Sequence, residues 1–231
     1  MQVRIPAVCL ILLLFVVPFA WADSLQDALQ AARSGNYTKA HALWLPEAEK
    51  GCSQSQYNMG LLYYHGRGVL QDYKEAAQWY QLAAEQGYAN AQNNLGMMHK
   101  HGKGMPQDYN EAVKWFRLAA EQDLHNAQYN LGLMYGDGLG VLRDYKEEAK
   151  WLQLSAEQGD ADAQQTLGFS YFKGHGVPQS NVDAYAWWAV AAANNNQEAR
   201  KNMETAQSLW PSSEIEKGQQ LAKEIWARIN K

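Results

Sequence analysis

Histidine, serine and cysteine are the side chains of this sequence that could support metal or nucleophilic chemistry. His99 and His101 form a His-x-His pair, and His65 stands 36 residues before His101. Side chains at i and i+2 on a helix point apart, and equivalent residues of stacked repeats lie too far apart to share a zinc ion with ligands at ~2 Å. We therefore predict no metal site and no cofactor.

The candidate nucleophiles are Ser170, Ser180 and Cys52, which are scattered along the sequence. A hydrolase needs a nucleophile beside a positioned base. We predict no catalytic residue and no enzymatic activity. The alternative that stays open is a hydrolase acting on β-lactam or cell-wall peptide substrates, which turnover of the chromogenic cephalosporin nitrocefin would reveal.

The first 22 residues have the composition of a signal peptide. Arg4 precedes an apolar run from Ile5 to Ala20, and Ala20-Trp21-Ala22 provides the small residues of a cleavage site, so we predict cleavage before Asp23. The run has 16 residues, fewer than the ~20 of a membrane-spanning helix, although a retained anchor is the alternative. We expect a periplasmic or secreted protein with no membrane insertion after cleavage.

The charge and the cysteine content of the mature chain limit which partners and which crosslinks we expect. Removing residues 1–22 takes away the charge of Arg4 and changes the formal net charge from −4 to −5. A mildly acidic chain without a basic run is not expected to bind nucleic acid. Cys52 would be the one remaining cysteine, so an internal disulfide is excluded. Its role and the oligomeric state stay open.

A repeat of 36 residues organises the chain into four blocks: 52–87, 88–123, 124–159 and 160–195. Six columns are identical in all four blocks: Gln56/92/128/164, Gly60/96/132/168, Gly66/102/138/174, Gly68/104/140/176, Trp79/115/151/187 and Ala84/120/156/192. Repetition at such a period indicates a repeat architecture. We expect residues 23–51 to form an N-terminal capping unit and residues 196–231 to form C-terminal capping helices.

Each block is predicted to contain two helices, A and B. In block 2, Ala91, Leu95 and Met98 follow helical spacing in helix A. Gly96 suggests a close approach by the next helix backbone. Helix B is predicted to begin at a cap at 72, 108, 144 and 180, and its apolar band to comprise Ala77, Trp79, Leu82 and Ala83. Each unit or block is predicted to close on a residue that tolerates positive φ: Gly51, Gly87, Asp123, Gly159 and Asn195.

Block 3 resembles the Sel1-like (suppressor-of-lin-like) repeat in Ala-Gln-Tyr-Asn-Leu-Gly-Leu-Met-Tyr, Gly-Leu-Gly-Val and Asp-Tyr-Lys-Glu-Glu-Ala-Lys-Trp, within residues 127–159. The resemblance implies an all-α fold, a right-handed α-α superhelix of helix-turn-helix repeats related to the tetratricopeptide repeat. It also implies a protein-binding adaptor whose A helices line a concave face. A cysteine-rich branch linked to β-lactams has paired cysteines in its repeats, which this chain lacks. Glu148 replaces the alanine of the other blocks, so we expect block 3 to be looser or its helix B locally exposed.

Four columns of helix A, which we call the inner columns, are the predicted binding surface for another protein or an extended peptide. Three are rich in Tyr, Leu, Met and Phe, which form an apolar patch if solvated. The fourth offers amides that could hydrogen-bond a peptide backbone. The alternative is that these side chains only pack between helices. The predicted contact residues are Tyr57, Asn58, Leu61, Tyr64, Asn93, Asn94, Met97, Lys100, Tyr129, Asn130, Leu133, Gln165, Phe169 and Phe172.

Overall fold

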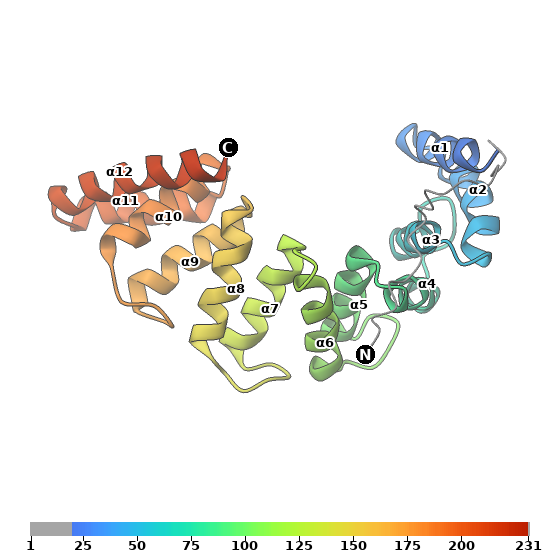
Figure 1. Ribbon diagram of the computed structural model, residues 1–231, viewed down its shortest axis with the longest axis horizontal. Helices are drawn as coiled ribbons and strands as arrows, with labels where there is room; N and C mark the ends of the chain where they lie inside the picture. Colours follow the sequence, from blue (N-terminus) through green and yellow to red (C-terminus); the bar gives the residue numbers. More distant parts are fainter. Residues whose placement is uncertain (1–19, 231) are drawn as a thin grey trace, which may run out of the picture. The chain divides into compact units, whose positions relative to one another are not determined.

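The computed structural model describes residues 20–230, with side chains from Leu25 onward, and these residues form twelve α-helices and no strand (Figure 1). The predicted signal segment lies outside the described residues except for its last three, with which the first helix begins. None of the described helices is both long enough and apolar enough to cross a bilayer. The predicted all-α fold is confirmed.

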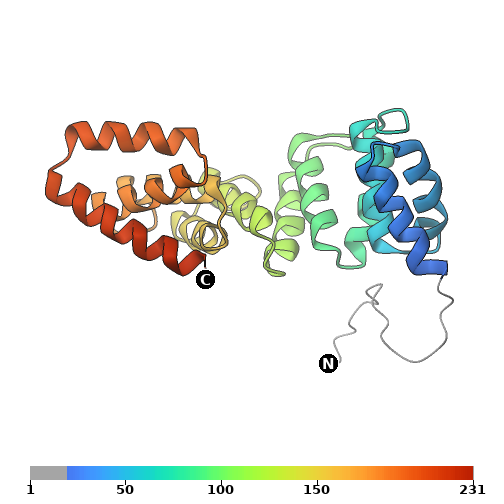
Figure 2. The same ribbon diagram turned by 90° about the horizontal axis from the view of Figure 1, so that it is seen from above.

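The chain divides into two compact units, Met1–Ala119 and Ala120–Lys231. Within each unit, consecutive helices pack side by side and run in opposite directions (Figures 1 and 2). The first unit contains α1 (Ala20–Arg33), α2 (Tyr37–Glu49), α3 (Ser53–His65), α4 (Tyr73–Glu85), α5 (Ala89–His101) and α6 (Tyr109–Ala120), which ends on the first residue of the second unit. The second contains α7 (His125–Asp137), α8 (Tyr145–Glu157), α9 (Ala161–Lys173), α10 (Asn181–Ala193), α11 (Gln197–Leu209) and α12 (Ser212–Ile229).

The predicted ends of the helices are formed by local hydrogen bonds and backbone angles. The carboxylate of Asp72 accepts hydrogen bonds from the backbone amides of Lys74 and Glu75, and Asp144 does the same for α8. All five predicted closing positions have positive φ, including the non-glycine residues Asp123 (φ 61°) and Asn195 (φ 68°). These caps satisfy amide groups that would otherwise lack partners at a helix terminus.

Glycines inside the A helices admit large side chains from the B helices and also allow the predicted close approach of backbone, since a Cβ at Gly96 would lie 3.2 Å from the carbonyl oxygen of Ala112. A Cβ at Gly60 would lie 2.5 Å from the ring of Tyr80, and one at Gly96 would lie 2.8 Å from the ring of Phe116. Tyr80 and Phe116 are among the most deeply buried large side chains. The glycine column therefore creates a pocket for a ring, which ties the two helices of a repeat together.

The core is built mainly from the predicted positions, with one exception on α4. Ala91, Leu95 and Met98 are buried as predicted, but Leu82 is 44% exposed. Its predicted core role belongs instead to Tyr80, because that residue points at the glycine of α3. The Trp column is buried at Trp151 and Trp187, while its other two members pack partly exposed against core clusters.

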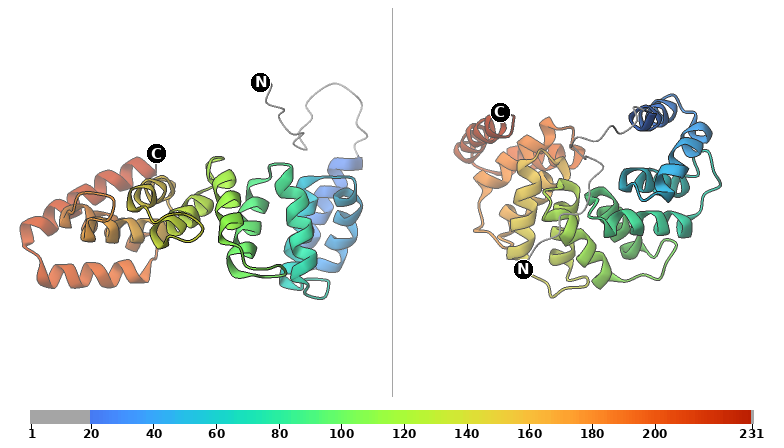
Figure 3. Two further views of the ribbon diagram at one scale, coloured as in Figure 1. Left: turned by 90° about the horizontal axis from the view of Figure 1, so that it is seen from below. Right: turned by 45° about the vertical axis from the view of Figure 1, so that its right-hand side comes forward.

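The last helix of the second unit packs against α10 more than against its sequence neighbour α11 (Figure 3). Ala222 and Ile225 of α12 join the cluster that contains Trp187. Gly218 lies against the side chain of Tyr185, since a Cβ there would be 2.9 Å from it. These contacts cover the apolar surface of the last repeat.

Glu148 contradicts the expectation that block 3 is loose or has an exposed helix B. Glu148 is only 9% exposed. Burial, and to a smaller extent the negative charge of Asp137, raises the pKa of its carboxyl to about 7. The carboxylate lies beside Gly136, where the repeats at Tyr64 and Phe172 have an aromatic side chain. The missing side chain at Gly136 therefore leaves room for Glu148 inside the helix pair.

Candidate binding surface

The inner columns of the first unit lie on α3 and α5 and are neither fully buried nor fully exposed. Of the eight predicted contact residues in this unit, only Asn58 is buried. The other seven are partly exposed: Tyr57, Leu61, Tyr64, Asn93, Asn94, Met97 and Lys100. The prediction of solvated side chains is thus met only in part. Partial exposure leaves these residues in reach of a partner while they also pack within the unit.

Tyr57 and Asn94 take part in internal packing. The ring of Tyr57 lies 5.1 Å from the ring of Tyr88 and 5.9 Å from that of Tyr80. Asn94 hydrogen-bonds the hydroxyl groups of both Tyr57 and Tyr80, and burial raises the pKa of Tyr57 despite that bond. Both side chains therefore hold α3, α4 and α5 together, as the packing alternative requires.

Tyr64 forms a polar and aromatic cluster at the end of α3. Its hydroxyl accepts a hydrogen bond of 2.7 Å from the ammonium of Lys103, and that ammonium also lies 5.4 Å from the ring centre of Tyr73. The Tyr64 hydroxyl raises the pKa of Lys103 through the hydrogen bond. Cation–π contacts of this kind stabilise exposed aromatic surfaces, so Tyr64 is held in one orientation.

In the second unit the inner columns lie on α7 and α9. Tyr129, Asn130, Leu133, Gln165 and Phe172 are partly exposed, while Phe169 is 42% exposed. The hydroxyl of Tyr129 hydrogen-bonds Thr166, and burial raises its pKa. The backbone carbonyl of Gln165 accepts a hydrogen bond of 3.2 Å from the indole of Trp188.

The inner columns of each unit border a cavity. In the first unit a cavity of about 290 Å³ is lined by Asn58 and Leu61 together with residues of α1 and α2. In the second unit a cavity of about 140 Å³ is lined by Phe169, Phe172 and residues of α10 and α11. Phe172 stacks on Trp210 with ring centres 5.7 Å apart, which makes one wall of the second cavity aromatic.

The surroundings of two candidate nucleophiles, Ser180 and Cys52, and of a further histidine, His125, give no sign of a catalytic or metal site. Ser180 caps α10, with its hydroxyl accepting from the amide of Asp183 at 3.2 Å. Cys52 forms no disulfide within the described residues and is of intermediate exposure. The imidazole of His125 lies 3.2 Å from the carboxylate of Asp160. Within residues 20–230 no group of three His, Cys, Asp or Glu side chains is arranged to hold a metal ion.

Sequence reasoning did not pair Ser170 with Lys173, although the two have the Ser-x-x-Lys spacing of penicillin-binding enzymes. Ser170 is 3% exposed, and its hydroxyl donates to the carbonyl of Thr166 at 3.1 Å. The ammonium of Lys173 lies over the rings of Phe169 and Phe172, 4.8 Å from the centre of the latter. A covered hydroxyl engaged with its own helix is poorly placed to attack a substrate.

Comparison with known proteins identifies the repeat. The family model of the Sel1 repeat matches four times, at residues 53–88, 89–124, 125–160 and 161–196. The chain belongs to the Sel1-repeat family. The predicted resemblance is confirmed, and the matches begin one residue later than the blocks defined above. Sel1-repeat proteins generally serve as scaffolds for protein interaction and are typically non-catalytic.

Two solved structures of this family share the fold. A protective antigen of uropathogenic Escherichia coli, c5321, is 30% identical with a TM-score of 0.76, and the match covers 89% of this chain and 46% of that protein. A Sel1-repeat protein of Oxalobacter formigenes is 29% identical with a TM-score of 0.75, covering 88% and 85%. This Sel1-repeat chain therefore spans less than half of the antigen. No curated protein matches it.

Proposed function

We propose that this protein is a non-catalytic adaptor of the bacterial cell envelope or extracellular space, which binds another protein or an extended peptide through its inner columns. The signal-like composition of residues 1–22 supports the location. The scaffold role of Sel1-repeat proteins supports the class of function. We assign the binding surface to the inner columns because members of these columns line both cavities.

The observation on which the proposal rests is that both cavities include a member of the same column. Leu61 borders the cavity of the first unit, and Phe169 borders that of the second. Leu82 and Leu118 on the B helices are each 44% exposed as well, but neither lines these cavities. Concave sites lined by apolar side chains with a few polar groups are the usual places for ligands.

Affinity capture with matched variants tests the surface. Leu61→Ser with Phe169→Ser removes apolar area from the inner columns, and Leu82→Ser with Leu118→Ser removes it from exposed B-helix positions as a control. We expect proteins that are retained by the wild-type and by the control to be lost from the inner-column variant, with all three folded by circular dichroism. Equal retention by all three proteins, or loss from the control alone, would refute the proposal.

The location is tested separately by fractionation of the native bacterium. We expect the protein in the periplasm or medium, with Asp23 as its first residue by mass spectrometry of the intact chain. A cytoplasmic protein that begins at Met1 would contradict the envelope part of the proposal and leave the binding surface untouched.

A further inference from the structure

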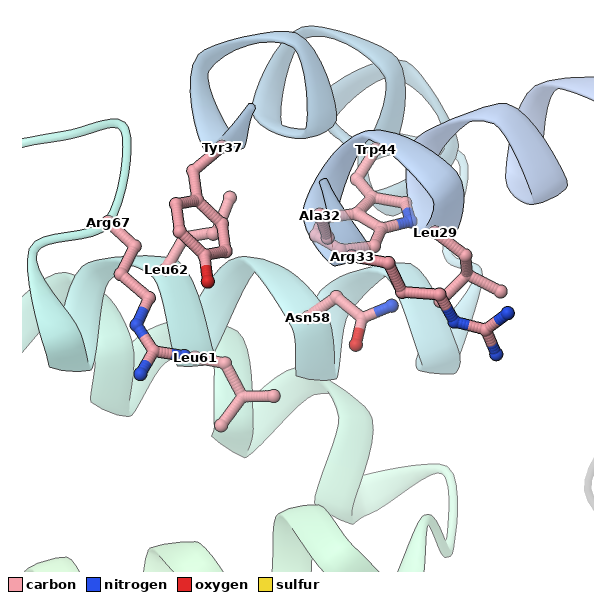
Figure 4. A pocket seen from close by; sticks show the side chains of 9 residues that line it. All are labelled: Leu29, Ala32, Arg33, Tyr37, Trp44, Asn58, Leu61, Leu62 and Arg67. Atoms are coloured by element: carbon pink, nitrogen blue, oxygen red, sulfur yellow. The ribbon is translucent and has the colours of Figure 1, made fainter. Parts of the chain in front are cut away.

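The cavity of the first unit combines an apolar lining with hydrogen-bond donors that have no acceptor. It lies between α1, α2 and α3 (Figure 4), and Leu29 and Leu61 contribute apolar side chains to it. Asn58 on α3 and Trp44 on α2 also line it. In the view of Figure 4 the amide nitrogen of Asn58 points toward the side occupied by Leu29 and Arg33.

Two buried nitrogen atoms of this cavity lack partners among the described residues. Asn58 is 8% exposed and Trp44 is 4% exposed, and neither Nδ2 of Asn58 nor Nε1 of Trp44 has a hydrogen-bond acceptor there. Buried donors are normally paired, and an unpaired one costs free energy that an incoming acceptor recovers. The cavity is thus prepared for a ligand that brings acceptors.

In other repeats, residues in the same columns as Asn58 and Trp44 have hydrogen-bond partners. Asn94 stands in the same column as Asn58 and bonds the hydroxyls of two tyrosines. Trp188 stands in the same column as Trp44 and donates to the carbonyl of Gln165 at 3.2 Å. The capping unit and the first repeat therefore each keep a donor, Trp44 and Asn58, without the acceptor that satisfies its equivalent elsewhere.

The charges around the cavity are positive. Arg33, in the last turn of α1, and Arg67, after α3, both line the cavity, and no acidic residue does. The guanidinium of Arg67 lies 5.4 Å from the ring centre of Tyr37, which fixes it at the cavity edge. Arginine pairs well with carboxylates through its planar set of donors. An acceptor with negative charge therefore fits better than a neutral one.

We propose that this cavity receives the acidic side chain of an extended segment of the partner, with a neighbouring apolar residue of that segment against Leu29 and Leu61. The methylene groups of a glutamate would contact the apolar lining, and its carboxylate would accept from the two buried nitrogens and from the arginines. This assignment rests on the proposed function, since it specifies which residues of a partner the first unit recognises.

Nuclear magnetic resonance tests the assignment with defined peptides. The probes are Ser-Leu-Glu-Ser and Ser-Leu-Gln-Ser, both acetylated and amidated, and Ser-Leu with a free carboxyl terminus. We expect the glutamate peptide to shift the indole signal of Trp44 and the side-chain amide signal of Asn58, and to bind at least about tenfold more tightly than the glutamine peptide. The indole signal is assigned by its loss in Trp44→Phe.

Variants of the protein distinguish recognition from folding. Asn58→Leu removes the amide at similar volume, and the double variant Arg33→Gln with Arg67→Gln changes only exposed side chains. Both are expected to lose the preference for glutamate, whereas the exposed control Asn90→Leu keeps it. The double variant tests the proposal even if Asn58→Leu unfolds, because neither arginine is part of the core.

The other possible outcomes separate the glutamate assignment from the proposed function. Equal shifts with glutamine would overturn the carboxylate assignment, and shifts only with the free terminus would overturn the acidic side chain as its source. If capture depends on Leu61 and Phe169 but the glutamate peptide does not bind, the proposed function stands and this assignment fails. If the peptide binds but capture is independent of those residues, the assignment stands as a ligand site and the proposed function fails.

Discussion

The carboxylate of Glu148 on α8 occupies the space beside Gly136 on α7 that a larger side chain would fill. Equivalent positions of other blocks combine Tyr64 with Ala76 and Phe172 with Ala184. Two substitutions of one block thus compensate each other, because a small residue on one helix accommodates a long side chain from the other. In block 3 a carboxyl group, instead of an aromatic ring, fills the space between the two helices.

This relationship predicts strong coupling between the two positions. Gly136→Tyr is expected to destabilise the protein, because its ring competes with the buried Glu148. Combining it with Glu148→Ala recreates the pair found in the first repeat and should recover most of the loss. Denaturant unfolding of the two single variants and the double variant should give a coupling free energy of about 1–3 kcal/mol. Additive effects would show that the side chains do not share one space.

The pKa of Glu148 predicts that stability falls as the pH rises from about 4.5 to 7. The carboxyl has a pKa of about 7 in the folded chain, raised from 4.5 mainly by burial and also by Asp137, while Arg143 opposes the shift. Between these values the unfolded chain releases a proton that the folded chain retains. The resulting loss is complete above the folded pKa and amounts to at most about 3 kcal/mol.

Melting temperatures between pH 4 and 8 test this dependence. Glu148→Gln keeps the shape of the side chain without its charge, so its melting temperature should exceed that of the wild-type at pH 8 and approach it near pH 4. Glu121→Gln, at an exposed position, should follow the wild-type. A pH dependence that Glu148→Gln leaves unaltered would assign the effect to other groups.

The identical glutamine column predicts a second source of stability. Gln164 is fully buried, its amide donates to the carbonyl of Ala156 at 3.0 Å, and its carbonyl accepts from Asn194 at 3.0 Å. Gln164→Leu would remove both of these buried hydrogen bonds and should cost about 1–3 kcal/mol. The exposed control Gln197→Leu should cost little. Equal unfolding free energies for the two variants would mean that the buried bonds contribute nothing.

A glycine of the intra-repeat loop is predicted to be more sensitive than one between repeats. Gly176 has φ +70° and its Cβ position falls on the backbone of Tyr145, whereas Gly159 has φ +92° with nothing within 4 Å. Gly159→Ala therefore suffers only backbone strain of about 1–2 kcal/mol. Gly176→Ala adds a backbone collision and should be clearly worse in thermal unfolding. A reversed order would contradict the tight contact of this loop.

The repeat made most of the helices predictable, because the caps and closing residues act locally. Asp72, Asp144 and Asn195 needed only sequence spacing to be assigned. The burial of Glu148 depends on which residue of α7 faces it, and that requires the packing of the two helices. A signal was nonetheless present, since the one block with glutamate at this position in place of alanine is also the one block with a glycine, Gly136, in the column that holds Tyr64, Lys100 and Phe172 elsewhere.

The candidate surface was less predictable than the fold. Three members of one column are asparagines, yet Asn94 is engaged by tyrosines while the Nδ2 of Asn58 has no acceptor among the described residues. The difference arises from side chains on neighbouring helices that the repeat does not specify. The division between Ala119 and Ala120 has no counterpart in the sequence pattern, because the repeat runs through it without interruption.

Site-specific photo-crosslinking in the native organism is the most direct test of the inner columns as the partner surface. Benzoylphenylalanine would replace Met97 on α5 or Leu118 on α6, the latter being exposed outside the inner columns. We predict a defined covalent adduct with a partner protein from position 97 and none from position 118. Adducts of equal strength from both positions, or from position 118 alone, would contradict binding through the inner columns.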